Sequence, residues 1–327
     1  MSRLIRTLAA LAVLALALGV AACGDDSDDA AATTSAAPGG TPVTVAVLPI
    51  IETAAVYVAQ EKGLFAEQGL DVTITTANTS SAIIPGLVSG QYDIGFSNMV
   101  TFLLANNEGL GLTAIAAGSA PNPAGDEDMA SVIATDPAIR TMADLKGKTV
   151  AVNALNNIAA VSLNESLRKA GVDPGDVKLV ELGFGDQGAA LADGQVDAAF
   201  TVEPFMAIAT KDGAHVVGYP YLDVDPDLTI ASYVMSDKTL AADPEVATKF
   251  AAAVRAAVGL IDSDRQVLLD AVSSFSDIDP KLLPGLVLCG FPTAINRESV
   301  ANWGRLMVED GLVERAPDVD PLIAEGA

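Results

Sequence analysis

The chain has 327 residues, of which 50% are hydrophobic and 18% are charged, enough apolar material for two lobes with separate cores. It carries 42 acidic and 18 basic residues, which give a formal net charge of −24. Such an acidic surface repels nucleic acids and anionic lipid headgroups, so we expect no nucleic-acid partner.

Residues 1–22 have the pattern of an export signal. Two arginines precede an apolar run, Leu8 to Gly19, which is too short to span a bilayer as a mature helix. The next segment, Val20-Ala21-Ala22-Cys23, resembles the bacterial lipobox, in which cleavage occurs before a cysteine that receives a diacylglyceryl group. We therefore expect lipidation of Cys23 and a protein anchored to the cell membrane, facing outward. The alternative is an ordinary secretory signal followed by an incidental cysteine.

The lipidated cysteine should be followed by a tether, together residues 23–41. The tether is rich in Asp, Ala, Thr, Ser, Pro and Gly and cannot bury apolar surface, so we expect it to be disordered and to hold the folded body roughly 20 Å or more from the lipid. The other cysteine, Cys289, lies in an apolar segment and is interpreted as a small buried residue.

Beyond the tether, strand patterns alternate with helical patterns, which predicts an α/β fold with parallel sheets and right-handed crossovers. The first series is strand 43–48, helix 54–68, strand 71–75, helix 81–89, strand 92–96, helix 100–107 and strand 112–117. After a strand at 130–135, the second series is strand 149–152, helix 158–170, strand 177–182, a short helix at 189–191 and strand 196–200. A strand follows at 229–235, and nearly everything after Pro244 has a helical pattern.

One segment occurs twice. Gly90-Gln91-Tyr92-Asp93-Ile94-Gly95-Phe96-Ser97-Asn98 returns 104 residues later as Gly194-Gln195-Val196-Asp197-Ala198-Ala199-Phe200-Thr201-Val202-Glu203. Each copy predicts a helix end, a tight turn at glycine and a buried strand. Ligands of open α/β sheets bind beyond the carboxyl ends of the strands, so the two copies should form two mouths that face each other across a cleft.

Three segments resemble a known family: Tyr57 to Val72 (YVAQEKGLFAEQGLDV), Gly90 to Gly95 (GQYDIG) and Asp144 to Val150 (DLKGKTV). They are similar to the periplasmic-type substrate-binding proteins of ABC importers for nitrate, alkanesulfonates and taurine, and for pyrimidine precursors of thiamine. The resemblance runs from about Val43 to the C-terminal helices. It implies the two-lobe periplasmic-binding-protein-like fold of type II, with two parallel-rich sheets flanked by helices.

That family encloses a small solute at a hinge of two crossing strands and delivers it to the transmembrane subunits of a permease. The resemblance therefore implies crossings at 130–135 and 229–235, a first lobe of residues 42–134 plus 229–327, and a second lobe of residues 135–228. We expect a monomer with a small-molecule solute and a permease as its partners.

No Lys or Arg occurs in the loops at the predicted strand ends, which are residues 49–54, 78–81, 97–99, 119–122, 153–157 and 201–205. Hydrogen-bond donors must then come from hydroxyls, side-chain amides and helix N-termini, where the helix dipole also favours an anion. Thr53, Ser81, Ser97 and Asn157 each precede a predicted helix, although each could serve only as an N-cap. The candidate ligand-binding residues are Glu52, Thr53, Ser81, Ser97, Asn98, Ser119, Asn153, Asn156, Asn157, Thr201 and Glu203.

Two of these candidates are acids. Glu203 follows a buried strand directly and precedes Pro204, so its side chain should point into the cleft, whereas Glu52 could face water. A carboxylate repels a bare anion and pairs with an ammonium or an amino-heterocycle. We expect a sulfonate-, taurine- or nitrate-like solute; the alternative is an aminopyrimidine precursor of thiamine, held by Glu203 between aromatic rings such as those of Tyr57 or Phe205.

The sequence gives less support to an enzyme function. Gly183 to Gly188 fits the pattern G-x-G-x-x-G, but the helix after it stops by Gly194, so we interpret the segment as a cleft-lining loop and not as a dinucleotide site. A related eukaryotic group makes a thiamine pyrimidine on this fold with cysteine-rich and histidine chemistry, which Cys289 and the single His215 do not match. We expect a protein that is not an enzyme, with no cofactor and no metal.

Overall fold

The structure, a computed structural model, describes residues 39–327. The predicted export signal, the lipidation of Cys23 and most of the tether lie outside the described residues. Within residues 39–327, no helix is both long enough and apolar enough to cross a membrane.

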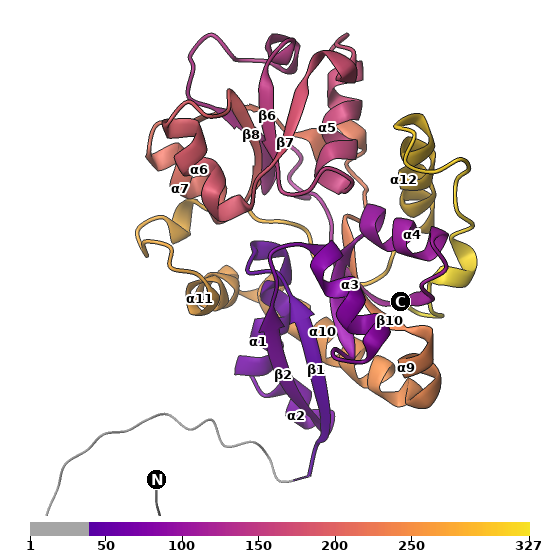
Figure 1. The fold of residues 1–327 in the computed structure, drawn as a ribbon. Coiled ribbons are helices and arrows are strands. Elements are labelled where there is room, and N and C mark those ends of the chain that lie inside the picture. Colours follow the sequence, from indigo (N-terminus) through magenta and orange to yellow (C-terminus); the bar gives the residue numbers. More distant parts are fainter. Residues whose placement is uncertain (1–38) are drawn as a thin grey trace, which may run out of the picture. The chain divides into compact units, whose positions relative to one another are not determined.

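The first sheet has five strands in the order β2-β1-β3-β10-β4. β1 and β2 lie side by side at one edge of it (Figure 1). β1, β2 and β3 are parallel, and β10 is antiparallel to both of its neighbours. β3 and β10 are buried along their whole length, which explains why their sequences lack polar alternation. The strands are β1 (Thr41–Val47), β2 (Leu70–Thr76), β3 (Ile94–Asn98), β4 (Leu112–Ser119) and β10 (Ala231–Ser236); the helices beside them are α1 (Ala54–Glu61), α2 (Leu64–Glu67), α3 (Ser80–Ser89) and α4 (Met99–Asn107).

The second sheet repeats this plan in the order β7-β6-β8-β5-β9. β5 is its antiparallel strand and lies between β8 and β9, as β10 lies between β3 and β4 in the first sheet. Each sheet therefore contains the first strand formed after the chain crosses between the lobes. The strands are β5 (Ala130–Ala134), β6 (Thr149–Val152), β7 (Lys178–Glu181), β8 (Ala198–Val202) and β9 (His215–Gly218); the helices are α5 (Ile158–Lys169), α6 (Phe184–Ala192), α7 (Phe205–Lys211) and α8 (Pro220–Val224).

Several expected boundaries were wrong. β5 pairs with β8 in the second sheet, Val132 opposite Phe200, so residues 130–134 do not belong to the first lobe as expected. The two crossings are the segments 120–129 and 225–230, which precede β5 and β10. The expected helix 54–68 is two helices separated at Gly63, whose φ of 73° is left-handed. The expected loop at Gly183 to Gly188 is instead the start of α6.

The repeated segment has a structural role that is the same in both copies. Gly90 and Gly194 have φ of 79° and 67°, as a helix end at glycine requires. Asp93 Oδ2 then accepts the backbone N–H of Thr44 on β1 at 2.8 Å, and Asp197 Oδ2 accepts that of Thr149 on β6, also at 2.8 Å. β3 and β8 each begin just after this aspartate, two residues later than expected.

The C-terminal region contacts both lobes. α10 packs against α1 and α2, and α12 contacts α4 and α5. α12 also holds the second crossing, because Trp303 Nε1 donates to the carbonyl of Thr229 at 2.9 Å and Ser299 Oγ accepts the N–H of Thr229 at 2.7 Å. The helices are α9 (Asp237–Ala242), α10 (Pro244–Ser263), α11 (Arg265–Phe275) and α12 (Arg297–Glu309), and short 3-10 helices lie at Ile51–Thr53, Met142–Leu145, Pro174–Asp176, Leu283–Gly285 and Asp320–Leu322. Much of 276–296 is irregular, so the helical pattern expected there was wrong.

Candidate ligand-binding site

The two lobes meet at the carboxyl ends of β1, β3, β6 and β8, where Ile51 N donates to the carbonyl of Glu203 at 3.1 Å. A small space there, which we call the inner pocket, has a volume of about 30 Å³, room for about one water molecule. An adjoining outer pocket has about 150 Å³. The inner pocket is lined by Leu48, Ile50, Glu52, Ser80, Phe96, Asn98 and Ile230 of the first lobe and by Asn153, Asn157, Ile158, Phe184, Val202 and Tyr221 of the second.

Glu52 is the acidic group of the inner pocket. It lies in the 3-10 helix after β1, is 4% exposed, and its Oε1 accepts from the hydroxyl of Ser119 at 2.9 Å. Burial raises the pKa of Glu52 to about 7; the bond from Ser119 opposes this rise and the charge of Asp128 adds to it. Near neutral pH the carboxyl group is therefore present in both protonation states, and it can donate or accept a hydrogen bond.

The amide groups of the inner pocket are oriented by helix capping. Asn98 Oδ1 accepts from Thr101 N at 2.9 Å and caps α4, and Asn157 Oδ1 accepts from two N–H groups of α5. Asn157 Nδ2 donates to Asn153 Oδ1 at 2.7 Å. Within the described residues these contacts occupy the amide oxygens and leave the Nδ2 groups of Asn98 and Asn153 free to donate. Since Ser80 is the first residue of α3, three helices begin at the inner pocket.

Tyr221 adds a hydroxyl and Phe96 and Phe184 add apolar faces. Burial, with the charges of Glu52 and Asp128, raises the pKa of Tyr221 well above its ordinary value, so the hydroxyl keeps its proton. The inner pocket thus combines N–H and O–H donors, one titratable carboxyl group and aromatic walls, and none of its lining residues is Lys or Arg.

Glu203 lies next to the cleft but lines neither pocket. Its side chain is 1% exposed, with Oε2 accepting from Ala207 N at 3.0 Å and Oε1 from Val287 N at 3.1 Å. Burial raises the pKa of Glu203 to about 7 against the effect of these two hydrogen bonds. The carboxyl group therefore connects the end of β8 to α7 and to the C-terminal segment.

The other candidate residues divide by position. Ser119 reaches the pocket only through Glu52, and Thr53 is buried with its hydroxyl donating to the carbonyls of Leu48 and Ile50 at 2.7 and 2.9 Å. Ser97 Oγ donates to the carbonyl of Asn98, and Thr201 is buried within β8. Asn156 and Ser81 are exposed. Ser81 lies inside the first turn of α3 and not before it, because Thr79 is the N-cap.

Sequence reasoning missed nine of the thirteen lining residues; those among them with a polar or aromatic side chain are Ser80, Phe96, Phe184 and Tyr221. Ser80 is adjacent to a predicted site residue, and Phe184 lies inside the G-x-G-x-x-G pattern, so both had a local signal. Of the two aromatic residues suggested to sandwich a solute, Phe205 lines the outer pocket and stacks on Phe184 with centroids 6.1 Å apart. Tyr57 instead packs on Phe275 at 4.5 Å and lines neither pocket.

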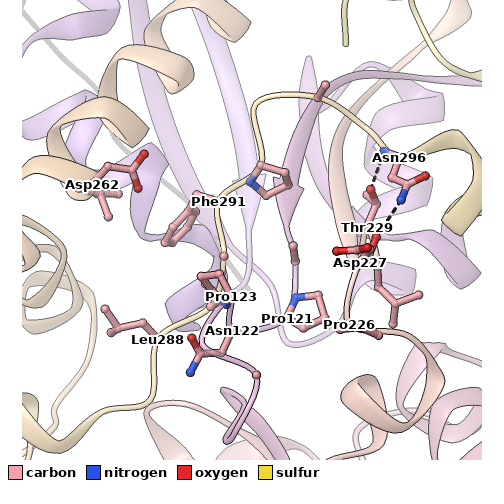
Figure 2. Close-up of a pocket in the computed structure, with 18 of the residues that line it drawn as sticks. Pro121, Asn122, Pro123, Pro226, Asp227, Thr229, Asp262, Leu288, Phe291 and Asn296 are labelled. Carbon is pink, nitrogen blue, oxygen red and sulfur yellow. Dashed lines mark hydrogen bonds between the residues drawn. The ribbon is translucent and has the colours of Figure 1, made fainter.

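A larger pocket of about 780 Å³ lies along the two crossings and the segment 288–296 (Figure 2). Its charged lining residues, Asp227, Asp262 and Arg265, are exposed, and the Arg265 guanidinium donates to two backbone carbonyls. Asn296 bonds to Thr229 and to the carbonyl of Asp227, as the dashed lines show. This pocket offers no buried polar group comparable to Glu52, so we place the candidate site at the inner pocket despite its smaller volume.

Within residues 39–327 no group of three or more His, Cys, Asp or Glu side chains is placed to hold a metal ion.

A family model described as "NMT1/THI5 like" matches residues 51–263. The chain belongs to this family. Its relatives include 4-amino-5-hydroxymethyl-2-methylpyrimidine phosphate synthase THI13 of Saccharomyces cerevisiae, 24% identical over 241 residues that cover 69% of this chain and 67% of the relative. A putative binding protein of Brucella abortus is 26% identical over 266 residues, covering 80% of this chain and 75% of the relative.

Solved structures of substrate-binding proteins share the fold. The ligand-binding component of an ABC-type import system from Staphylococcus aureus, solved with zinc bound, has a TM-score of 0.77 at 16% identity, over 88% of this chain and 99% of the other. The alkanesulfonate-binding protein SsuA from Xanthomonas axonopodis pv. citri, bound to MOPS, gives 0.74 at 20% identity, over 88% and 99%. The aliphatic sulphonate binding protein SsuA of Escherichia coli gives 0.72 at 18% identity, over 86% and 97%. The expected two-lobe periplasmic-binding-protein-like fold is confirmed.

Proposed function

We propose that the protein is an extracytoplasmic solute-binding lipoprotein of an ABC importer, which captures a small solute between its lobes and delivers it to a permease. The observation that carries this proposal is the inner pocket, where both lobes contribute buried polar groups around apolar walls. Its volume of about 30 Å³ admits no solute of several heavy atoms in this arrangement. A solute therefore enters when the lobes separate and is enclosed when they close about the crossings.

The polar groups favour a solute that carries both an amino group and an acceptor. The helix starts at Ser80, Asn98 and Asn157 favour oxygen acceptors or negative charge. The free Nδ2 groups of Asn98 and Asn153 are hydrogen-bond donors and favour the same kind of solute. Glu52 favours the opposite, an N–H donor or an ammonium. A taurine-like zwitterion satisfies both sets, whereas nitrate satisfies only the donors and would lie near an ionisable carboxyl group.

A second solute class, the aminopyrimidines, is favoured by the raised pKa of Glu52 and the aromatic walls. A protonated carboxyl group can donate to a ring nitrogen while its other oxygen accepts from the adjacent amino group. Phe96, Phe184 and Tyr221 provide flat apolar surfaces for such a ring. The yeast relatives are named as synthases of an aminopyrimidine phosphate, which adds support for this class.

The positions of the potentially reactive side chains favour a protein that binds its solute without reacting with it. His215 Nε2 lies 2.7 Å from the carbonyl oxygen of Ile139, and the residue lines neither the inner nor the outer pocket. Cys289 is buried outside both pockets, and burial raises the pKa of its thiol well above the ordinary value, which suppresses the nucleophilic thiolate. Neither side chain is placed to react with a molecule in the inner pocket.

The solute class can be tested by thermal-shift measurements with taurine, an alkanesulfonate, nitrate and 4-amino-5-hydroxymethyl-2-methylpyrimidine. A solute at about 100 times its Kd should add roughly 2.7 kcal/mol of stability, a shift of several degrees. We expect Glu52→Gln to weaken binding of the responding amino compound by about tenfold or more, and Glu61→Gln, an exposed acid on α1, to leave it unchanged. A response to nitrate alone, or equal affinities for Glu52→Gln and the parent protein, would contradict the proposed solute class.

The membrane anchor is tested separately. In cells, Cys23→Ser should abolish labelling with a radioactive fatty acid and release the protein from the membrane fraction. Continued lipid labelling of the Cys23→Ser variant would show that the acceptor is a different residue, and a parent protein without lipid would refute the anchor.

A further inference from the structure

Phe184 lies between three spaces. It lines the inner pocket, the outer pocket and a third space of about 240 Å³ between α6 and α7. The inner and outer pockets share only Leu48, Ile50 and Phe184. Leu48 and Ile50 belong to the first lobe and Phe184 to the second, so Phe184 is the residue of the second lobe at the boundary of the two pockets.

The third space gives this ring a place to move. It is lined mainly by apolar and small residues of α6 and α7, among them Leu191, Ile208 and Ala209, and also by Phe205, on which Phe184 stacks at an interplanar angle of 23°. A rotation of the Phe184 side chain towards this space would keep its contact with apolar neighbours. The same rotation would join the inner pocket of about 30 Å³ to the outer pocket of about 150 Å³.

The glycines on either side of Phe184 are not required by packing. A Cβ atom at Gly183 would meet no atom closer than 3.7 Å, and one at Gly185 none closer than 3.8 Å, which are ordinary contact distances. Gly183 has φ of −56°, which other residues adopt freely, and the φ of Gly185 is also outside the left-handed region. The remaining effect of two glycines is the conformational freedom that they give to the backbone around Phe184.

We propose that Phe184 is the gate of the inner pocket: its ring closes over a bound solute and rotates towards the space between α6 and α7 to admit or release it. The proposal rests on the proposed function, and it assigns to the G-x-G-x-x-G pattern the role of making the gate mobile. The gate acts in addition to the separation of the lobes, because it controls passage from the outer to the inner pocket. The closed ring also favours solutes that present a flat or apolar face to it.

The test measures access to the inner pocket without any solute. A cysteine is introduced in the full chain at Ser80, inside the gate, and in a second variant at Asn78, which lines the outer pocket. The rate of modification by a methanethiosulfonate reagent is then measured, and the reactivity of the parent protein's own cysteines is subtracted. We expect Phe184→Ala to accelerate modification of Ser80→Cys tenfold or more and to leave that of Asn78→Cys within twofold.

The double variant Gly183→Ala/Gly185→Ala keeps the ring but stiffens its backbone, so it should slow modification of Ser80→Cys by severalfold. Circular dichroism spectra and melting temperatures of all variants verify that they are folded, and Phe184→Leu replaces Phe184→Ala if the latter is not. Equal rates for Ser80→Cys with and without Phe184 would overturn the gate. That result would leave solute binding intact, whereas a protein that binds no solute but shows gated access would instead refute the proposed function.

Discussion

The buried carboxyl group of Glu52 should make the stability of the protein depend on pH. Its pKa is raised from 4.5 to about 7, so the folded protein holds this proton more tightly than the unfolded chain does. Unfolding then releases a proton between these two pH values, and stability falls as pH rises through this range; the full loss is present above pH 7. At about 1.36 kcal/mol for each tenfold change in proton affinity, the difference corresponds to roughly 3 kcal/mol.

Glu52→Gln removes the contribution of Glu52 to this dependence, because glutamine is similar in shape, can accept from the Ser119 hydroxyl and has no charge to desolvate. The contributions of Glu203 and Asp128, whose pKa values are also raised by burial, remain. The variant and the parent protein should have similar stabilities at pH 4.5, and the variant should be the more stable by up to about 3 kcal/mol at pH 8. Urea unfolding followed by circular dichroism across this pH range measures the difference. The exposed Glu61→Gln is the control. If Glu52→Gln and the parent protein lose stability equally between pH 4.5 and pH 8, the assignment of a desolvated carboxyl group at Glu52 is refuted.

Three further predictions concern the framework of the site. Asp93→Ala and Asp197→Ala each remove the acceptor for one partly buried strand N–H, so each should lower stability by about 1 kcal/mol without changing solute affinity. Urea unfolding and calorimetric titration measure the two effects, and a large loss of affinity would contradict a purely structural role. Asn157→Ala removes both the cap of α5 and the donor to Asn153, so it should cost about 1 kcal/mol and weaken binding, whereas Asn157→Ser restores most of the stability and not the affinity. Cys289 should resist alkylation at pH 8 until the protein unfolds, as peptide mapping with iodoacetamide can show; rapid labelling of the folded protein would contradict its burial.

The architecture was largely predictable because its signals are local. The left-handed glycines at 90 and 194 and the uninterrupted apolar runs after them specify a helix end followed by a buried strand, and both strands occur, each two residues later than expected. The sheet to which each strand belongs was harder to predict from the sequence. β5 has the same kind of apolar sequence as any buried strand, and its place in the second sheet depends on the crossing before it, not on its own residues.

The site could be predicted only in part, since orientation depends on tertiary contacts. Asn157 is next to a helix in sequence and in the structure, and it both caps α5 and lines the inner pocket. The prediction of Ser81 was wrong by one residue. Thr79 is the N-cap of α3, and Ser80, whose hydroxyl accepts from Asn98 N, lines the inner pocket. Glu52, a candidate that could also have faced water, lines the inner pocket, whereas Glu203, which was expected to point into the cleft, lines neither pocket. The N–H groups of Ala207 and Val287 hold Glu203 in place, and the Val287 contact joins residues 84 positions apart.

The central claim, that a small amino-bearing solute binds between the lobes at the inner pocket, is tested most directly by isothermal titration calorimetry of the full chain. The panel is taurine, an alkanesulfonate, nitrate and 4-amino-5-hydroxymethyl-2-methylpyrimidine, each titrated into the parent protein and into Asn153→Ala, which removes a free donor from the second lobe. We predict saturable binding of one molecule of taurine or of the aminopyrimidine per chain, and a loss of affinity of about tenfold in Asn153→Ala. No binding of any amino compound, or a Kd that Asn153→Ala leaves unchanged, would contradict the account.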